Sequence, residues 1–534
     1  MPVTTRALRR FVRADSMVAA GILASRLAGL VRTMIFSYFF GLRSDAADAF
    51  NAAVRIPNLL QNLFGEGALS GSFIPVHAGL RAQGRDADAA QVARTVFALL
   101  MVVISVLVLA GVLATPVLLE VIAPGFTGDK RALSVRLVRI LFPAAGMLVA
   151  ASWCLGVLNS LGKFLLSYAS GVAWNAGMIG ALILFGPGSP LDSLAIKLAW
   201  GSVAGSILQF AVQAPTAFSL SSGGGGIALS EPVRRTIHDF FPVLISRGAV
   251  QISAYIDNVI ASWLPTGAVT GLQNASLLYT LPVSLFGISV SAAELPALSS
   301  VAARDERDAL RARINAALER LTFFVVPSAV AFALLGDVVA GALLQRGRFS
   351  HQDSIIVWGI LAGSSIGLVA STQSRLYSVA HYAIGDTKTP LRFALVRLSF
   401  VTALGWVCAL VLPPRLGIAP IWGAAGLTAS AGVSGWIEFA LLRRSMNHRI
   451  GRTGVPAARM TRLWFAASAA AILAFAVKRL FTPALASAAL RVASPGWIPI
   501  LRGAMVLPVF GGAFLLLTVL LGVPISALRR ARRT

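Results

Sequence analysis

Apolar stretches of about 20 residues recur from one end of the chain to the other, and each is long enough to cross the ~30 Å hydrocarbon core of a membrane. Only 13% of the 534 residues are charged, whereas soluble domains average about 25%. Lipid offers the backbone no hydrogen-bonding partners, so a spanning chain must form helices or a closed barrel. Because the stretches are continuously apolar and do not alternate with polar residues, the sequence predicts an all-α polytopic membrane protein.

We predict about fourteen membrane spans from the positions of these stretches. Their approximate bounds are 16–41, 49–79, 95–122, 133–158, 164–186, 191–216, 237–264, 270–300, 316–344, 354–380, 389–412, 418–442, 461–481 and 500–524. Trp153 and Trp464 lie near span ends, and we expect them to anchor those spans at the membrane surface. An even number of spans places both ends of the chain on the same side of the membrane.

Lys and Arg are concentrated in the loops that follow even-numbered spans. The last of these loops contains Arg443, Arg444, Arg449, Arg452 and Arg459. Positively charged loops remain in the cytoplasm, so this asymmetry predicts a multi-pass protein of the bacterial inner membrane with both termini in the cytoplasm. The same topology accounts for the formal net charge of +25 without a nucleic-acid partner. Such loops are also expected to contact anionic membrane lipids.

The two halves of the chain repeat. Five short matches recur in order at offsets of 221 to 225 residues, among them Ser25-Arg26 with Ser246-Arg247 and Leu63-Phe64-Gly65 with Leu285-Phe286-Gly287. We predict an N-terminal lobe at 1–220, a Gly-rich flexible linker at 221–236, a second lobe at 237–445, and two appended spans with a basic tail at 446–534. Six spans per lobe give two parallel repeats, a plan that in known transporters places the substrate site between the halves.

Ionisable residues inside spans are costly and usually face a charged partner or a water-filled cavity. The first span contains Arg26 and Arg32, six residues apart, so both can line one broad wall. Asp48, Arg55 and Glu66 lie in or near the second span. Guanidinium groups bind phosphate through two parallel hydrogen bonds and stay charged when partly desolvated. This concentration of arginine predicts a transport path for an anionic ligand.

The seventh span contains Arg247 and Asp257, which are about 15 Å apart along a helix and too far from each other for a direct pair. Asp257 is a candidate for coupling transport to a proton or another cation, and a hydrogen-bonded structural carboxylate is the equal alternative. For the first two spans, the structural alternative pairs Arg32 with Asp48 or Glu66.

The chain contains no motif for catalysis or cofactor binding. It lacks a P-loop, a dinucleotide-binding fingerprint, an HExxH motif and a CxxC motif, and its five histidines have no ligand spacing. We therefore expect a transporter and no enzyme, with no cofactor and no firm metal site. We expect transport to be coupled to the membrane potential or to a monovalent cation. The segment Gly385–Pro390 is interpreted as a structural turn.

Several segments resemble the signature of the MurJ (MviN) lipid II flippase family, and they follow in the expected order. They are Ser25–Arg32, Asp48–Phe50, Arg55–Leu60, Phe64–Ser70, Phe73–Pro75, Ala123–Phe126, Gly156–Asn159 and Asp386–Pro390. The similarity extends over nearly the whole chain, its N-terminal motif is long and specific, and the fourteen-span count agrees.

The resemblance implies membership of the multidrug/oligosaccharidyl-lipid/polysaccharide exporter superfamily, in which two six-helix lobes alternate access around a cationic cavity. Members of the MurJ family move lipid II, the undecaprenyl-diphosphate-linked peptidoglycan precursor, from the cytoplasmic to the outer leaflet. By position, Arg26 and Arg32 with the neighbouring Ser25 would contact the substrate head, while Asp48 and Glu66 would orient those arginines or gate the cavity. The last two helices would hold the lipid tail, and the cell-wall synthesis machinery is an expected partner.

The chain also departs from the family pattern. Gln61 occupies a position of the second span at which members of the family commonly have an arginine. Leu277 aligns with an arginine that family members often have in the second lobe. Asp257 matches a family carboxylate implicated in sodium binding. Arg55 and Arg247 are candidates to replace the missing charges in the substrate path.

Three functions remain open from the sequence. The first is a lipid II flippase, which the arginines and the resemblance favour. The second is an exporter of another polyprenyl-linked glycan, because the second-span and second-lobe arginines are missing. The third is a cation-coupled drug antiporter, which would require a path dominated by carboxylates and aromatic rings, whereas arginines dominate here.

Overall fold

The computed structural model describes the backbone of residues 5–223, 226–492 and 495–523. Within these ranges it describes the side chains except at 5–20, 22, 66, 245–254, 288, 292–293, 482–492 and 495. Every regular element in the described ranges is a helix, which confirms the predicted all-α class. The chain forms two compact units. One contains the residues up to Phe40 and Ser44–Trp263, and the other contains Gly41–Arg43 and the residues from Leu264 onward.

The helices of the first unit follow one another through turns and loops. They are α1 (Thr5–Phe40), α2 (Asp45–Phe64), α3 (Glu66–Ala82), α4 (Asp86–Leu113), α5 (Thr115–Ile122), α6 (Gly128–Ser160), α7 (Phe164–Ala169), α8 (Gly171–Phe185), α9 (Leu191–Leu220) and α10 (Glu231–Ser262). The second predicted span is thus two helices, joined at Gly65. A Cβ atom on Gly65 would lie only 2.2 Å from the carbonyl oxygen of Gln61, so no larger residue fits this junction.

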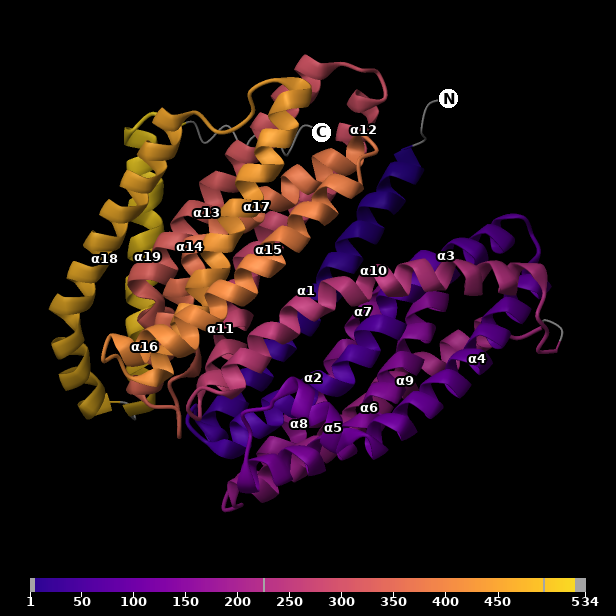
Figure 1. The fold of residues 1–534 in the computed structure, drawn as a ribbon, viewed down its shortest axis with the longest axis horizontal. Helices are drawn as coiled ribbons and strands as arrows, with labels where there is room; N and C mark the ends of the chain where they lie inside the picture. Colours follow the sequence, from indigo (N-terminus) through magenta and orange to yellow (C-terminus); the bar gives the residue numbers. More distant parts are fainter. Residues whose placement is uncertain (1–4, 224–225, 493–494, 524–534) are drawn as a thin grey trace. The chain divides into compact units, whose positions relative to one another are not determined.

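The core of the first unit lies where α3, α4, α6 and α9 pack together (Figure 1). Trp153 on α6 is fully buried there, and its indole N–H donates a hydrogen bond to the carbonyl oxygen of Ala93 at 3.0 Å. Its ring packs against Phe97 and Phe218. The expectation that Trp153 anchors a span at the membrane surface is therefore wrong. The indole N–H finds a backbone acceptor inside the bundle, which allows complete burial.

The second unit continues the all-helical pattern. Its elements are α11 (Ala268–Pro282), the π-helical segment η1 (Val283–Ile288), α12 (Ser289–Ala302), α13 (Arg307–Leu344), α14 (His351–Ala383), α15 (Lys388–Trp406), the π-helical segment η2 (Val407–Val411), α16 (Leu412–Arg415), the short 3₁₀ helix η3 (Pro420–Trp422), α17 (Gly423–Ile450), α18 (Ala457–Val492), the 3₁₀ helix η4 (Pro495–Trp497) and α19 (Ile498–Leu520). The eighth predicted span corresponds to α11, η1 and α12, and the eleventh to α15, η2 and α16.

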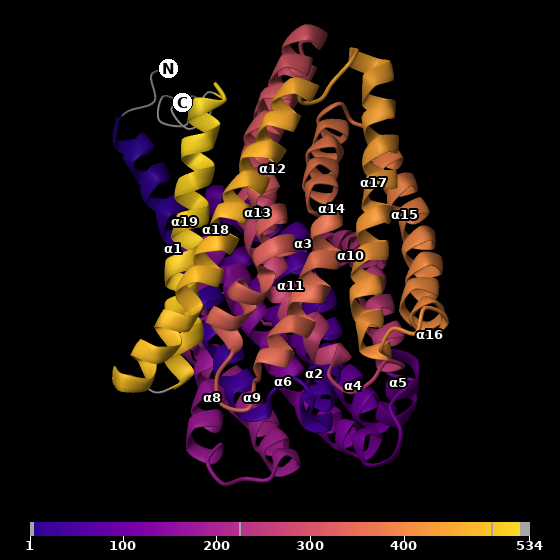
Figure 2. The ribbon, with the colours of Figure 1, turned by 90° about the vertical axis from the view of Figure 1, so that its left-hand side faces the viewer.

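Helices α13, α14 and α17 pack together in the second unit, and α15 packs on α17 (Figure 2). The two appended helices, α18 and α19, lie side by side and contact α13. Two ion pairs also join α18 to α13. Lys478 lies 2.5 Å from Asp337, and Arg459 pairs with Glu319. The pair of helices without a counterpart in the first half is therefore held to the second unit through α13.

Close helix crossings in both units depend on glycine. On α8, a Cβ atom at Gly177 would lie 2.5 Å from the Cα atom of Gly205 on α9. On α14, a Cβ atom at Gly367 would lie 2.4 Å from the Cα atom of Gly432 on α17. Backbones that approach this closely gain van der Waals contact, which drives helix association where lipid removes the hydrophobic effect between helices.

Eleven helical stretches in the described residues are long and apolar enough to cross a membrane. The predicted count of fourteen is therefore not confirmed. The three predicted spans outside this set, 16–41, 49–79 and 237–264, correspond to α1, to α2 with α3, and to α10. These are the spans in which the sequence analysis places the functional charges.

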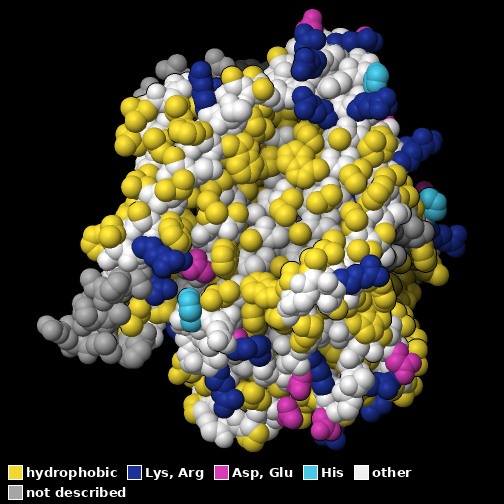
Figure 3. Space-filling view, turned by 60° about the vertical axis from the view of Figure 1, so that its left-hand side comes forward, with side chains coloured by type: hydrophobic (Ala, Val, Ile, Leu, Met, Phe, Trp, Pro, Cys, Tyr) yellow, Lys and Arg dark blue, Asp and Glu magenta, His cyan; other side chains and the backbone are white. Residues whose placement is uncertain are grey.

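Many outward-facing side chains are large and hydrophobic, as contact with lipid requires. On α4, exposed residues recur at about one helical turn, namely Val102, Val106, Leu109 and Leu113. Figure 3 shows hydrophobic side chains over much of one face of the molecule, with Lys and Arg gathered most densely toward its upper right. This distribution agrees with a protein that is embedded in a membrane.

The division of the chain into repeated lobes stays a prediction. The linker predicted at 221–236 overlaps the start of α10, which begins at Glu231 and belongs to the first compact unit. The compact units are defined by packing, whereas the lobes are defined by offsets in the sequence. The bounds of the compact units therefore do not test the predicted bounds of the lobes.

Candidate functional site

Arg32 on α1 is held against an aromatic ring of α8. Its guanidinium carbon lies 5.2 Å from the ring centroid of Trp174, and Nη1 lies 3.7 Å from Sδ of Met178. The Trp174 indole N–H in turn donates to Ser202 Oγ at 3.0 Å, which fixes the ring. Among the side chains that the structure describes, no carboxylate lies within salt-bridge distance of Arg32. The ring orients the guanidinium while most of its N–H donors remain available to an anion.

Arg26 and Ser25 lie about two turns before Arg32 on the same helix. The Arg26 side chain is exposed. Ser25 contacts the first residue of α8, because a Cβ atom on Gly171 would lie only 2.6 Å from Ser25 Oγ. The close approach of α1 and α8 therefore positions Ser25 and Arg32 along the same pair of helices.

Asp48 at the start of α2 is 1% exposed and forms an ion pair with Lys130 of α6, whose Nζ lies 2.9 Å from Asp48 Oδ2. Lys130 Nζ also lies 3.4 Å from Asp45 Oδ1 and 4.4 Å from the ring centroid of Phe126. Lys130 was not among the candidate residues predicted from the sequence. The structure makes it a partner of Asp48, and this buried pair joins α2 to α6.

Replacing Lys130 with methionine is expected to destabilise the protein by about 3 kcal/mol, because it leaves the Asp48 carboxylate buried without its ammonium partner. The double variant D48N/K130M should recover most of this loss, since it removes both charges together. Thermal unfolding of the purified chain measures both effects. A K130M variant that melts with the parent would show that the pair does not stabilise the fold.

Arg55 on α2 and Asp257 on α10 lie within electrostatic reach of each other. The Tyr255 hydroxyl, also on α10, donates a hydrogen bond to the backbone carbonyl oxygen of Arg55 at 2.6 Å. The end of α10 is held in turn by Asn258, whose side-chain amide donates to the Ile122 carbonyl oxygen at 3.2 Å. The structure thus brings together two residues that the sequence analysis named for different roles, Arg55 for the substrate and Asp257 for a cation.

For two further candidate residues, Glu66 and Arg247, the structure describes only the backbone. Glu66 is the first residue of α3, and Arg247 lies in the middle of α10. Their side chains lie outside the described part of the structure. Their roles as an orienting group and as a second-lobe contact stay predictions.

The second unit contains a polar cluster that the sequence analysis missed. The Tyr279 hydroxyl on α11 lies 2.8 Å from Ser371 Oγ on α14, and it interacts electrostatically with Arg375 and Arg397. Arg397 Nη1 on α15 also lies 3.2 Å from Glu438 Oε2 on α17. The Arg397–Glu438 pair and Arg375 thus lie near Tyr279, two residues after the position where Leu277 replaces an arginine.

A signal for this cluster was present in the sequence. Arg397 and Glu438 both lie inside predicted spans, at 389–412 and 418–442, where an ionisable side chain needs a partner or a wet cavity. The same rule would have found Glu294, which is 4% exposed and lies 2.7 Å from Arg313 and 2.6 Å from Arg320.

The segment Gly385–Pro390 forms the predicted turn between α14 and α15. Asp386 Oδ1 accepts a hydrogen bond from the backbone N–H of Thr389 at 3.0 Å, and Oδ2 pairs with Arg449. Burial opposes ionisation of this carboxyl, but the bonds from Thr389 and the Arg449 guanidinium outweigh it and lower the pKa of Asp386 to about 2. In the described residues, no group of three or more His, Cys, Asp or Glu side chains is placed to hold a metal ion.

The family model and the curated relatives agree on one family. A family model described as the lipid II flippase MurJ matches residues 36–494. A curated relative from Rhizobium meliloti (strain 1021), described as a probable lipid II flippase MurJ, is 30% identical over 477 residues, which cover 87% of this chain and 86% of the relative.

Solved structures show the same architecture. The lipid II flippase MurJ in an inward closed conformation aligns with a TM-score of 0.69 at 23% identity, over 93% of this chain and 98% of that one. An inward-facing multidrug resistance transporter of the MATE family aligns with a TM-score of 0.65 at 14% identity, over 80% of this chain and 95% of that one. At these identities the structural likeness speaks for the fold alone. The family match over most of the chain and the relative at 30% identity show that this chain belongs to the lipid II flippase MurJ family.

Proposed function

We propose that this chain moves lipid II from the cytoplasmic to the outer leaflet of the bacterial inner membrane by alternating access. The observation that carries the proposal is Arg32, a cation inside a helical membrane protein that is oriented by Trp174 and has no carboxylate within salt-bridge distance among the described side chains. A diphosphate offers the guanidinium the bidentate acceptor that it lacks. Family membership supplies the identity of the cargo.

The role of the protein in transport follows from two properties of arginine. Its charge persists in a partly desolvated site, and its planar fork fits phosphate oxygens in two parallel hydrogen bonds. Arg32 would hold the diphosphate during transport, while Arg26 and Ser25 bind the head on its approach along α1. The prenyl tail stays in lipid throughout, so only the polar head requires a path through the protein.

The energy source and the orientation are part of the same proposal. The charge asymmetry of the loops supports a chain with both termini in the cytoplasm. Asp257 would bind a monovalent cation in one state of the cycle and interact with Arg55 in the other. A membrane potential supplies about 2.3 kcal/mol per charge per 100 mV, which is enough to bias such an exchange. The cell-wall synthesis machinery, which consumes the flipped precursor, is the proposed partner.

Complementation tests the proposal in cells. A bacterium is depleted of its own lipid II flippase and expresses this chain, with the amount of chain in the membrane measured in each strain. The expected result is normal growth and cell shape with no accumulation of lipid II. An empty vector and an R32A variant at matched membrane levels are the controls.

A second candidate function is export of another polyprenyl-linked glycan. It is favoured by Gln61 and Leu277, because the family pattern has an arginine at each of these two positions. A parent chain that reaches the membrane in full amount but fails to rescue growth would favour this second function. Arg375 and Arg397 would then be the first residues to compare with those that bind other glycan carriers.

A further inference from the structure

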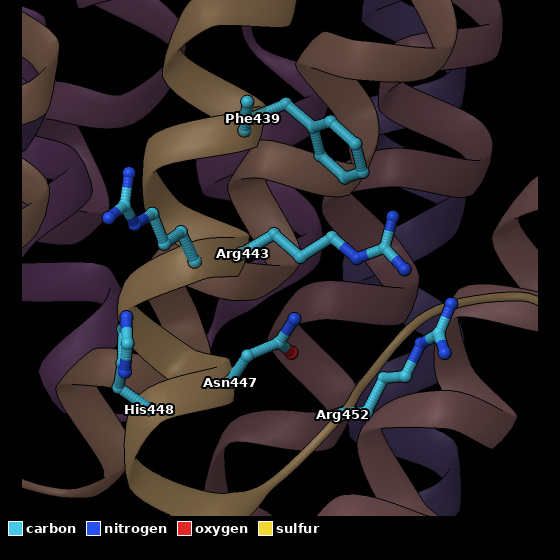
Figure 4. Close-up of a pocket in the computed structure, with 7 residues that line it drawn as sticks. Phe439, Arg443, Asn447, His448 and Arg452 are labelled. Carbon is cyan, nitrogen blue, oxygen red and sulfur yellow. The ribbon is translucent and has the colours of Figure 1, made fainter.

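A basic pocket lies at the C-terminal end of α17, away from the candidate transport residues and among the loop charges that the sequence places in the cytoplasm. It has a volume of about 480 Å³, and Phe439 and Ala440 provide its apolar side. Its polar lining consists of Arg443, Arg444, Asn447, His448 and Arg452. Figure 4 shows Arg443 on α17, Asn447 and His448 about one turn further along the helix, and Arg452 on the loop that follows it.

The arginines of this pocket form no ion pair with a described carboxylate, whereas several neighbouring arginines do. Nearby, Arg449 pairs with Asp386, Arg311 lies 2.7 Å from Asp308, and Arg459 pairs with Glu319. In the described part of the chain, no carboxylate lies within salt-bridge distance of Arg444 or Arg452. The pocket therefore concentrates positive charge that the described carboxylates leave without an ion-pair partner.

One wall of the pocket is held in place by hydrogen bonds. Arg443 Nε donates to the carbonyl oxygen of Thr453 at 2.9 Å. Asn447 Oδ1 accepts from the Thr453 backbone N–H at 2.8 Å and from its hydroxyl at 2.6 Å. The Thr453 hydroxyl also lies 2.9 Å from the hydroxyl of the buried Tyr377. Gly454, with φ +136°, brings the loop so close that a Cβ atom there would lie 2.5 Å from an Arg443 nitrogen. The loop that presents Arg452 is thus fixed to the helix.

The exposed face of α17 changes character at this pocket. Val433, Trp436, Ala440, Arg444 and His448 are all exposed and recur every three or four residues, so they form one stripe along the helix. The stripe is apolar up to Ala440 and basic from Arg444 onward. A change from an exposed valine and tryptophan to arginine marks the boundary between hydrocarbon and headgroups on a membrane helix.

We propose that this pocket binds the phosphate headgroup of an anionic phospholipid. The uncompensated guanidinium groups would hold the phosphate, and the apolar stripe directly beside them would contact the acyl chains. A free phosphate ion would use the arginines alone, so the stripe argues for the lipid as the source of the phosphate. The site is separate from the candidate transport residues on α1, α2 and α10, and the proposal does not depend on which glycan lipid the chain moves.

Native mass spectrometry of the purified full-length chain tests the proposal by titration with phosphatidylglycerol, phosphatidylcholine and inorganic phosphate. The double variant R444Q/R452Q removes the two exposed arginines and should weaken phosphatidylglycerol binding by about 20-fold. The matched control is K388Q/R392Q, which removes two exposed charges from the start of α15, outside the pocket. Ala440→Trp fills the pocket while keeping every arginine, and it should weaken binding without changing net charge. Thermal unfolding verifies that each variant is folded.

We expect the parent to prefer phosphatidylglycerol over phosphatidylcholine, inorganic phosphate not to displace the lipid, and only the two pocket variants to lose affinity. Equal losses in R444Q/R452Q and K388Q/R392Q would overturn the proposal, because binding would then depend on diffuse surface charge. Displacement of the lipid by inorganic phosphate at a similar concentration would also overturn it, because the site would then recognise phosphate without the acyl chains.

Discussion

Replacing Arg32 with alanine is expected to lower the rate of lipid II transport by at least about 100-fold, because it removes the guanidinium proposed to hold the diphosphate. Arg32→Lys should retain part of the activity, with a loss of about tenfold, since lysine keeps the charge but loses the planar fork and its stacking on Trp174. The measurement is the initial transport rate per inserted molecule. The stability of the fold should change little, because no described carboxylate pairs with Arg32.

Two further variants distinguish a role in binding from a role in packing. Trp174→Leu leaves Arg32 in place but removes the aromatic face that orients it, so transport should fall by about fivefold, less than in R32A. Arg415→Ala removes an exposed arginine at the end of α16 and should leave transport unchanged. If R32A and R415A transported lipid II equally well, Arg32 would have no part in substrate binding.

The second large effect is expected at Arg55 and Asp257. Each of the single variants R55Q and D257N should destabilise the protein by about 2–3 kcal/mol, because each leaves one charge of an interacting pair in the protein without the other. The double variant R55Q/D257N should be more stable than either single variant, since both charges are then absent. Thermal unfolding of the four proteins gives the coupling free energy. Additive losses would show that the two side chains are energetically independent.

Asp257 should also determine how transport responds to its energy source. In the parent, we expect the rate to rise with an inward-negative potential or with one monovalent cation. In D257N this dependence should disappear, because the carboxylate that exchanges between Arg55 and the cation is neutral. If D257N still responded to both conditions as the parent does, Asp257 would have no part in the coupling step. Its role would then be the structural one, in its interaction with Arg55.

Much of the fold could be predicted because hydropathy dictates it. Long apolar stretches in lipid have few alternatives to helices, and the predicted spans correspond to helices throughout the described residues. Trp153 shows where this reasoning ends. Its position near the end of a span suggested an interfacial anchor, but burial depends on partners such as Phe97 and Phe218, which come from other helices. Hydropathy along one helix does not reveal its neighbours.

The candidate site was predicted in part, for a similar reason. Arginines inside spans are visible in the sequence, so Arg32 and Arg55 could be named. Their partners could not, because Trp174 and Asp257 lie more than one hundred residues away along the chain. Asp48 was assigned to the arginines of the first span, whereas its ion pair is with Lys130. The cost of a buried charge predicts that a partner exists, but the packing of helices decides which residue it is.

The most direct test of the central claim is a transport measurement in reconstituted vesicles. The purified full-length chain is inserted into vesicles that contain fluorescent lipid II in both leaflets, and a membrane-impermeant quencher reports how fast the inner pool reaches the outer leaflet. The account predicts rapid loss of the protected pool with the parent chain, and a rate with R32A that is at least about 100-fold lower. Correctly inserted parent chain that moves lipid II no faster than protein-free vesicles do would contradict the account.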